Sequence, residues 1–172
     1  MTTAAPIDAD LWQCLSQVSD PEIPVISVIE LGIVREAHRH DDGSCEIVIT
    51  PTYSGCPAMQ VIADGIAHAL RSQGVEKINI RTQLSPAWTT DWMTEAGREK
   101  LRQYGIAPPA VRAAQAMNAI DISALIQDDA EIACPQCGSL HTRVISQFGS
   151  TACKALYRCS DCLEPFDYFK PH

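Results

Sequence analysis

Two cysteine pairs decide the fold of the C-terminal region: Cys134-Pro-Gln-Cys137 and Cys159-Ser-Asp-Cys162, which are separated by 21 residues. Each C-x2-C pair can make a tight turn that presents two sulfur atoms to one ion, and Gly138 follows the first pair, as such turns often require. Two turns supply four thiolates, the tetrahedral set that Zn²⁺ accepts without an open position. The spacing therefore predicts a structural Zn²⁺ site formed by Cys134, Cys137, Cys159 and Cys162.

The segment that carries these cysteines, residues 132–172, is too short to bury an adequate core, so bound metal would supply its folding free energy. Residues 142–148 and 154–158 favour strands, and the segment is typical of an all-β zinc ribbon. Iron is the alternative metal, because four cysteines also suit a rubredoxin-like centre or a cluster. We interpret Cys153 as a packed or free thiol, with replacement of one of the four ligands as the alternative, and His141 as a surface side chain.

Upstream of the ribbon, hydrophobic periodicity predicts a small α+β domain with a three-stranded sheet covered by helices. The boundaries that we expect are 1–105 for this domain, 106–131 for an alanine-rich linker and 132–172 for the ribbon. The predicted elements, in chain order, are a helix over 7–18, a hairpin of strands over 31–39 and 45–50, a helix from Pro57 to Gly74, a strand over 75–84, and a helix over 91–104 capped by Thr90.

Composition and charge argue against several classes of protein. Apolar residues make up 46% and charged residues 20% of the chain, which is ordinary for a globular protein. The net charge is −8, and a general nucleic-acid binder would need a basic footprint instead. No apolar run approaches the ~18 residues of a membrane span, and the first residues have no basic and apolar signal pattern. We therefore expect a cytoplasmic protein that binds neither membrane nor nucleic acid, in which clustered cysteines hold metal rather than form disulfides.

The second informative stretch is Thr50-Pro-Thr-Tyr-Ser-Gly-Cys56-Pro57. Proline suits the first turn of a helix, so Cys56 is expected at or next to the N-cap. Backbone N–H groups and the helix dipole at that place stabilise a thiolate and lower its pKa. Cys56 is therefore a candidate for metal binding or persulfide chemistry. The alternative is that a small residue merely begins a helix under the sheet.

Two carboxylates, Asp20 and Glu22, lie in a loop that follows the first predicted helix. They are candidates for contacts to a metal or a partner. The alternative is a capping aspartate beside a solvated glutamate. Tyr53, Trp88 and Trp92 are candidates to line a groove, although such aromatic residues more often belong to a core or its rim.

The same residues carry a family resemblance. Four stretches resemble the small α/β domain of SufT and of the eukaryotic cytosolic Fe–S targeting proteins, over roughly 8–104: Asp20-Pro-Glu-Ile-Pro24, Val28-Ile-Glu-Leu-Gly-Ile-Val34, Thr50 to Pro57, and Pro86-Ala-Trp88. The tail resembles the PaaD-like proteins of bacterial phenylacetate catabolism, through the two cysteine pairs, Phe148-Gly-Ser-Thr-Ala-Cys-Lys154 and Glu164-Pro-Phe-Asp-Tyr-Phe169. Together the two resemblances cover nearly the whole chain.

This resemblance implies an accessory or maturation factor for Fe–S clusters in the phenylacetyl-CoA epoxidase system, rather than an enzyme. The implied partners are the oxygenase and reductase subunits, and the reductase with its 2Fe–2S cluster is the implied client. The resemblance makes Cys56 the reactive or cluster-binding residue and places Asp20 and Glu22 in the family motif. A transient iron or Fe–S cluster on Cys56 would be shared across a homodimer, because one cysteine cannot satisfy a cluster. The alternative function is a stoichiometric structural subunit of the oxygenase.

Overall fold

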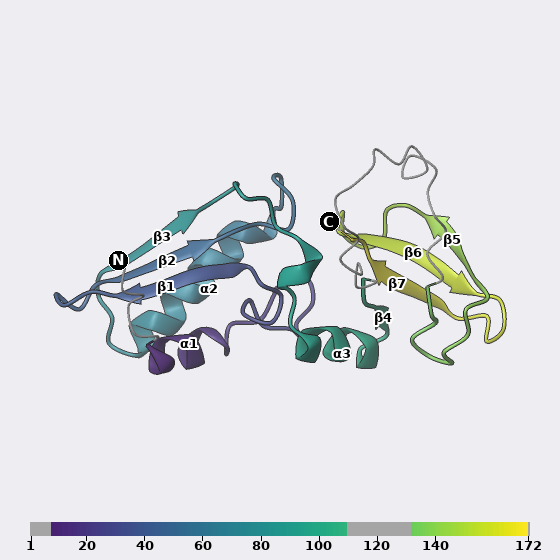
Figure 1. The fold of residues 1–172 in the computed structure, drawn as a ribbon, viewed down its shortest axis with the longest axis horizontal. Helices are drawn as coiled ribbons and strands as arrows, with labels where there is room; N and C mark the ends of the chain where they lie inside the picture. The colour runs from purple at the N-terminus through teal and green to yellow at the C-terminus, as the bar shows by residue number, and fades with distance from the viewer. Residues whose placement is uncertain (1–7, 110–131, 172) are drawn as a thin grey trace, which may run out of the picture. The chain divides into compact units, whose positions relative to one another are not determined.

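A computed structural model describes residues 8–109 and 132–171 of the protein (Figure 1). The chain divides into two compact units, of which the first ends at Gly97 and the second runs from Arg98 to Pro171. None of the helices in the described ranges has the length and apolar character that crossing a bilayer requires.

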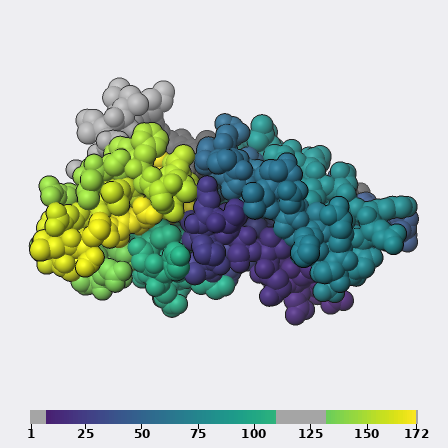
Figure 2. All heavy atoms as spheres, turned by 180° about the vertical axis from the view of Figure 1, so that it is seen from behind, coloured from purple at the N-terminus to yellow at the C-terminus, as the bar shows by residue number. Residues whose placement is uncertain are grey.

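The first unit is a three-stranded sheet with the strand order β1-β2-β3. β1 (Val34–Arg39) and β2 (Cys45–Ile49) form the predicted antiparallel hairpin, and β3 (Ile78–Thr82) pairs in parallel with β2. Parallel pairing requires a crossover, which α2 (Ala58–Ser72) provides. This helix lies behind the sheet in Figure 1 and faces the viewer in Figure 2. α1 (Ala9–Leu15) packs against α2 and β1.

The core of the first unit lies between the sheet and the two helices. α2 places Ile62, Ile66 and Leu70 on one face at a spacing of four residues, and all three are buried. β2 contributes Ile47 and Ile49, which alternate along the strand and are also buried. The predicted order of helices and strands is confirmed in this unit, and the sheet fixes the loops at its ends.

The loop before β1 packs closely on the segment around residue 92. Gly32 has φ +75°, and a Cβ added there would lie 2.6 Å from the carbonyl oxygen of Trp92. Only glycine combines this backbone conformation with so close an approach. The indole N–H of buried Trp88 donates to the carbonyl oxygen of Leu31 at 3.1 Å in the same region. The loop of residues 20–33 is therefore held firmly against the rest of the unit.

The single helix predicted over 91–104 is wrong in detail, because the segment folds as two helices. A 3-10 helix, η1 (Thr90–Trp92), is capped by Thr89 rather than Thr90. Met93 then adopts an extended conformation, which ends η1. α3 (Glu95–Gln103) follows, and the Thr94 hydroxyl accepts a hydrogen bond from the Gly97 N–H at 3.0 Å. Two capping threonines, one before each helix, thus divide the predicted helix.

The second unit begins within α3 and continues as a four-stranded sheet with the strand order β4-β7-β6-β5, as expected for a ribbon. β5 (Thr142–Ser146), β6 (Lys154–Cys159) and β7 (Pro165–Phe169) are antiparallel neighbours. The short β4 (Ile106–Ala107) pairs in parallel with β7. The sequence predicts only β5 and β6, and it assigns β4 to the start of the linker.

The rest of that predicted linker, residues 110–131, lies outside the described residues. The core of the second unit is small, and two of its seven buried members are cysteines of the C-x2-C pairs. Its members are Ala107, Ile132, Cys134, Ala155, Cys159, Phe166 and Tyr168. Two of the four predicted metal ligands therefore belong to the core itself.

Candidate functional site

The first cysteine pair lies in a tight turn before β5. The N–H of Gly138 donates to the carbonyl oxygen of Cys134 at 2.8 Å, and the N–H of Cys134 donates to the carbonyl oxygen of Ser139 at 2.9 Å. Gly138 has φ +75°, a conformation that favours glycine. These bonds fold residues 134–139 back on themselves, so that Cys134 and Cys137 point to the same side.

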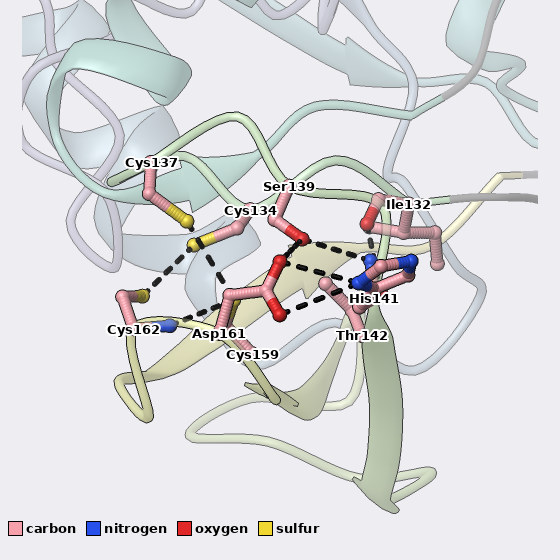
Figure 3. Close-up of polar contacts among 9 residues, drawn as sticks. All are labelled: Ile132, Cys134, Cys137, Ser139, His141, Thr142, Cys159, Asp161 and Cys162. Atoms are coloured by element: carbon pink, nitrogen blue, oxygen red, sulfur yellow. Dashed lines mark hydrogen bonds and ion pairs between the residues drawn. The ribbon is translucent and has the colours of Figure 1, made fainter.

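The second pair lies at the end of β6, in the turn to β7. The N–H of Cys159 donates to the carbonyl oxygen of Glu164 at 3.0 Å, which closes this turn. The N–H of Cys162 points to the sulfur of Cys159 at 3.5 Å, as expected where a backbone N–H stabilises a thiolate. Both turns therefore direct their sulfur atoms into one space (Figure 3).

The four sulfur atoms fit a tetrahedral zinc ion. They all lie within 4.8 Å of one another. The sulfur of Cys134 is 3.7 Å from that of Cys162, and the sulfur of Cys137 is 3.6 Å from that of Cys159. Tetrahedral Zn–S bonds of about 2.3 Å would place sulfur atoms about 3.8 Å apart. The structure thus brings together all four cysteines that the sequence predicts as ligands, in a geometry that suits a closed structural Zn²⁺ site.

The protonation of Cys137, Cys159 and Cys162 is linked, because their sulfur atoms share one small space. Backbone N–H groups of Cys162 and Asp161 lower the pKa of Cys159 to about 6. The Glu164 N–H favours the Cys162 thiolate, but burial and contacts with the other thiols outweigh it and raise the pKa of Cys162 to about 12. Without metal, the site therefore ionises one thiol readily and holds protons on others. Zinc must displace these protons, so its binding weakens as the pH falls.

The other candidate ligands of the ribbon stand apart from this group. Cys153 is buried, and its sulfur lies 3.0 Å from the hydroxyl oxygen of Thr151. His141 is exposed, and its Nδ1 lies 3.3 Å from the carboxylate of Asp161. Within the described residues, neither side chain belongs to the group of four. Their positions agree with a packed thiol and a surface histidine.

Cys56 lies in the loop between β2 and α2, immediately before Pro57, the N-cap of α2. Its N–H donates to the carbonyl oxygen of Tyr53 at 3.1 Å, which closes a turn. The side chain of Cys56 is half-buried. The prediction that Cys56 lies at or next to the N-cap is confirmed.

The prediction of a lowered pKa at Cys56 is wrong. Burial raises the pKa of this thiol, and the charges of Glu22 and Asp20 raise it further. Hydrogen bonds from the Ala58 N–H and from Tyr53 oppose the increase without reversing it. The helix start alone suggested a reactive thiolate, but the two carboxylates beside it could not be placed from the sequence. At neutral pH, Cys56 is therefore protonated.

Asp20 and Glu22 lie in the loop that follows α1, and their negative charges act on the thiol of Cys56. Asp20 is buried, and its Oδ1 accepts hydrogen bonds from the N–H groups of Glu22 and Ile23, both at 2.8 Å. Asp20 therefore organises its own loop, as in the capping alternative. Its charge and that of Glu22 nevertheless act on Cys56, so the three predicted residues lie in one region. Among the described residues they do not form a group whose ligand atoms could hold one metal ion, as the four ribbon cysteines do.

A groove of about 340 Å³ lies beside the Cys56 loop. Its lining residues come from the β2–α2 loop and from the segment after β3: Thr50, Pro51, Thr52, Tyr53, Ser54, Leu84, Ala87 and Trp88. Tyr53 and Trp88 therefore line a groove, although Trp88 is itself buried, whereas Trp92 is not among the lining residues. The hydroxyl of Thr50 is buried and has no hydrogen-bond partner in the described part of the chain. The sequence analysis missed Thr50 and Thr52, whose only signal is their place in the stretch that ends at Cys56.

Comparison with known families matches two parts of the chain separately. Residues 8–80 match the family described as iron-sulfur cluster assembly protein. Residues 120–170 match the family described as PaaD zinc beta ribbon domain. The first match contains Asp20, Glu22 and Cys56, and the second contains both cysteine pairs.

Curated relatives show the same division. Over 169 residues, the chain is 48% identical to an Escherichia coli (strain K12) protein that is named as a putative subunit of 1,2-phenylacetyl-CoA epoxidase, an alignment that covers 98% of this chain and 96% of the relative. It is 35% identical over 86 residues to the "Fe-S protein maturation auxiliary factor YitW" of Bacillus subtilis (strain 168), which covers 49% of this chain and 83% of that protein. Of these two relatives, the first extends over both units.

A solved structure shares the fold of the first unit. It is the crystal structure of a domain of unknown function, DUF59, from Bacillus anthracis. The TM-score is 0.51 at 24% identity, over 54% of this chain and 88% of that one. This likeness shows a common fold for the sheet and helices around Cys56.

Proposed function

We propose a function that starts from one premise, namely that this chain belongs to the family of PaaD-like proteins. The chain has an accessory role in a phenylacetyl-CoA epoxidase system, and within it acts as a maturation factor for Fe–S clusters. Its client is the reductase of that system. The first unit handles iron or a cluster as cargo, and the zinc ribbon is a structural or docking module.

The observation that carries this proposal is the half-buried thiol of Cys56 next to the N-cap of α2, in a loop that borders a groove and on which the charges of Glu22 and Asp20 act. The thiol of Cys56 supplies a sulfur ligand for iron or for a cluster. The raised pKa of Cys56 supports transient rather than permanent binding, because a proton competes with the metal for the sulfur. Cargo held in this way can be passed on to a client.

The difference between the four-cysteine site of the ribbon and the Cys56 site also supports this proposal. The four ribbon cysteines form a closed site that leaves no position for cargo. Cys56 is half-buried beside a groove and offers a single thiol. A cluster would need further ligands, which a second copy of the chain or the client would supply.

The test is a comparison of cells that produce the epoxidase system with the wild-type chain, with Cys56→Ser, or with Cys14→Ser. Cys14 is a partly buried cysteine of the same unit outside the candidate site, so it is the matched control. We expect Cys56→Ser to lower the cluster content of the reductase and the epoxidase activity, while Cys14→Ser leaves both unchanged. Intact reductase clusters and activity with Cys56→Ser would contradict the proposal.

A second candidate function is a stoichiometric structural subunit of the oxygenase. One observation favours it: the edge strand β5 and its flanks expose apolar side chains, including Val144, Ile145 and Phe148, on the ribbon. An exposed apolar edge suits a lasting protein interface. Co-purification with the catalytic subunits in a fixed ratio, unaffected by Cys56→Ser, would favour this function over the first.

A further inference from the structure

A hydrogen-bonded network joins the two cysteine turns of the ribbon outside the sulfur atoms (Figure 3). Its centre is Asp161, which lies between Cys159 and Cys162 in the second turn. The hydroxyl of Ser139, next to the first turn, donates to Asp161 Oδ2 at 2.5 Å. His141 Nδ1 lies 3.3 Å from Asp161 Oδ1. One carboxylate of the second turn is thus bound to two residues beside the first.

Backbone hydrogen bonds connect this network to the cysteine turns. The carbonyl oxygen of Ser139 accepts from the N–H of Cys134, and the Ser139 hydroxyl accepts from the N–H of His141 at 3.0 Å. The N–H of Ser160, between Cys159 and Asp161, donates to the carbonyl oxygen of His141 at 2.7 Å. The backbones of the two turns are therefore connected without any contribution from metal.

This arrangement is not that of a catalytic triad. Ser139 donates its proton to a carboxylate and not to an imidazole, so the serine–histidine–carboxylate order of a triad is absent. The His141 side chain is 79% exposed and that of Asp161 is 54% exposed, so the site does not exclude water. The network therefore fixes the two cysteine turns relative to each other rather than transferring protons.

We propose that Asp161 is a positioning residue of the zinc site, which holds the two cysteine turns in register and thereby slows the release of zinc. Four ligands from two separate turns must converge on one ion, and zinc leaves when one turn swings away from the other. The Ser139–Asp161 bond opposes that movement. Partners outside the ligand set commonly change metal affinity by about 10- to 100-fold, and the exposure of this pair points to the lower end of that range.

The experiment measures zinc release from the full chain into an excess of a chromophoric chelator at one fixed pH. The variants are Asp161→Ala, Ser139→Ala and the double variant. We expect each single variant to release zinc about tenfold faster than the wild type. The double variant is expected to release zinc more slowly than the product of the two single effects predicts, because both changes remove the Ser139–Asp161 bond. General loosening of the ribbon would instead make the two effects multiply.

Glu164→Gln is the matched control for charge. Glu164 lies two residues beyond Cys162 and, among the residues that the structure describes, its carboxylate has no hydrogen-bond or ion-pair partner. We expect zinc release from this variant at the wild-type rate. If Asp161→Ala does not bind zinc, Asp161→Asn replaces it in the experiment. This variant keeps the shape of the side chain and an acceptor oxygen but removes the charge.

Three outcomes would overturn the proposal: wild-type release from Asp161→Ala, multiplied effects in the double variant, or equal acceleration by Glu164→Gln. The proposal concerns the ribbon and is independent of the function proposed for Cys56. Its failure would leave the cargo site untouched, and loss of the cargo function would leave the zinc-release rates as predicted.

Discussion

The two units of this chain are stabilised in different ways. The first unit buries a continuous apolar core between a sheet and two helices, with Leu11, Ile47 and Ile66 fully buried. The second unit has a small core that includes Cys134 and Cys159. Six of the eight exposed large apolar side chains among the described residues belong to the second unit. Burial thus stabilises the first unit, whereas the second depends on metal.

The largest expected effect follows from this difference. Chelation of zinc from the full chain should unfold β5, β6 and β7 and leave β1, β2, β3 and α2 folded. A structural Zn²⁺ site contributes on the order of 10 kcal/mol, which exceeds what the small ribbon core supplies. Hydrogen exchange measured by mass spectrometry should show loss of amide protection in the ribbon strands alone. Protection that survives chelation in the ribbon, or that disappears from both units together, would contradict the comparison.

A substitution in the apolar core tests the stability of the first unit. Ile66→Ala should lower the free energy of unfolding of that unit by about 2–5 kcal/mol, because it opens a cavity in a packed core. All three tryptophans, Trp12, Trp88 and Trp92, lie in the first unit, so tryptophan fluorescence during urea unfolding follows it selectively.

Val61→Ala on the same helix is the control, because this side chain is 56% exposed. It should change the free energy of unfolding by less than about 0.5 kcal/mol. Zinc release should be the same in wild type and both variants. A change in zinc release with Ile66→Ala would show that the ribbon depends on the core of the first unit.

The sequence predicted different parts of the two units for different reasons. The spacing of Cys134, Cys137, Cys159 and Cys162 was sufficient for the metal group, because each pair is local and the chemistry of thiolates is narrow. Periodicity was sufficient for α2 and for the β1–β2 hairpin. It failed for β4, because two residues give no periodic pattern.

The site around Cys56 was predicted only in part. The position next to the helix N-cap is a local feature and was correct. The raised pKa depends on burial and on Glu22 and Asp20, which are more than thirty residues away in the chain. The Ser139–Asp161 bond was missed for the same reason, because both residues are polar surface types whose contact is set by the fold.

A smaller effect is expected from removing the charge of Glu22 near Cys56. Glu22→Gln should lower the pKa of Cys56 toward its ordinary value, because a negative charge near the thiol disfavours the thiolate. At a fixed pH below that pKa, the thiolate fraction rises and alkylation of Cys56 becomes faster. The change should be on the order of a few-fold, because solvent screens a partly exposed charge. Mass spectrometry of iodoacetamide-treated protein measures this rate at Cys56.

Glu76→Gln provides the comparison for this measurement. Glu76 is an exposed carboxylate of the same unit, and its charge is not among those that act on Cys56. It should leave the alkylation rate unchanged. An unchanged or slower rate with Glu22→Gln would show that Glu22 does not lie close to the thiol in solution.

The central claim is that the two units hold different metals for different purposes, zinc for structure and iron for transfer. Anaerobic analysis of zinc, iron and acid-labile sulfide in the wild type, Cys56→Ser and Cys134→Ser tests it most directly. The account predicts about one zinc per chain, as one closed four-cysteine site requires. Zinc should be lost only with Cys134→Ser, and iron with sulfide only with Cys56→Ser. Zinc alone in the wild type, or iron and sulfide that persist in Cys56→Ser, would contradict it.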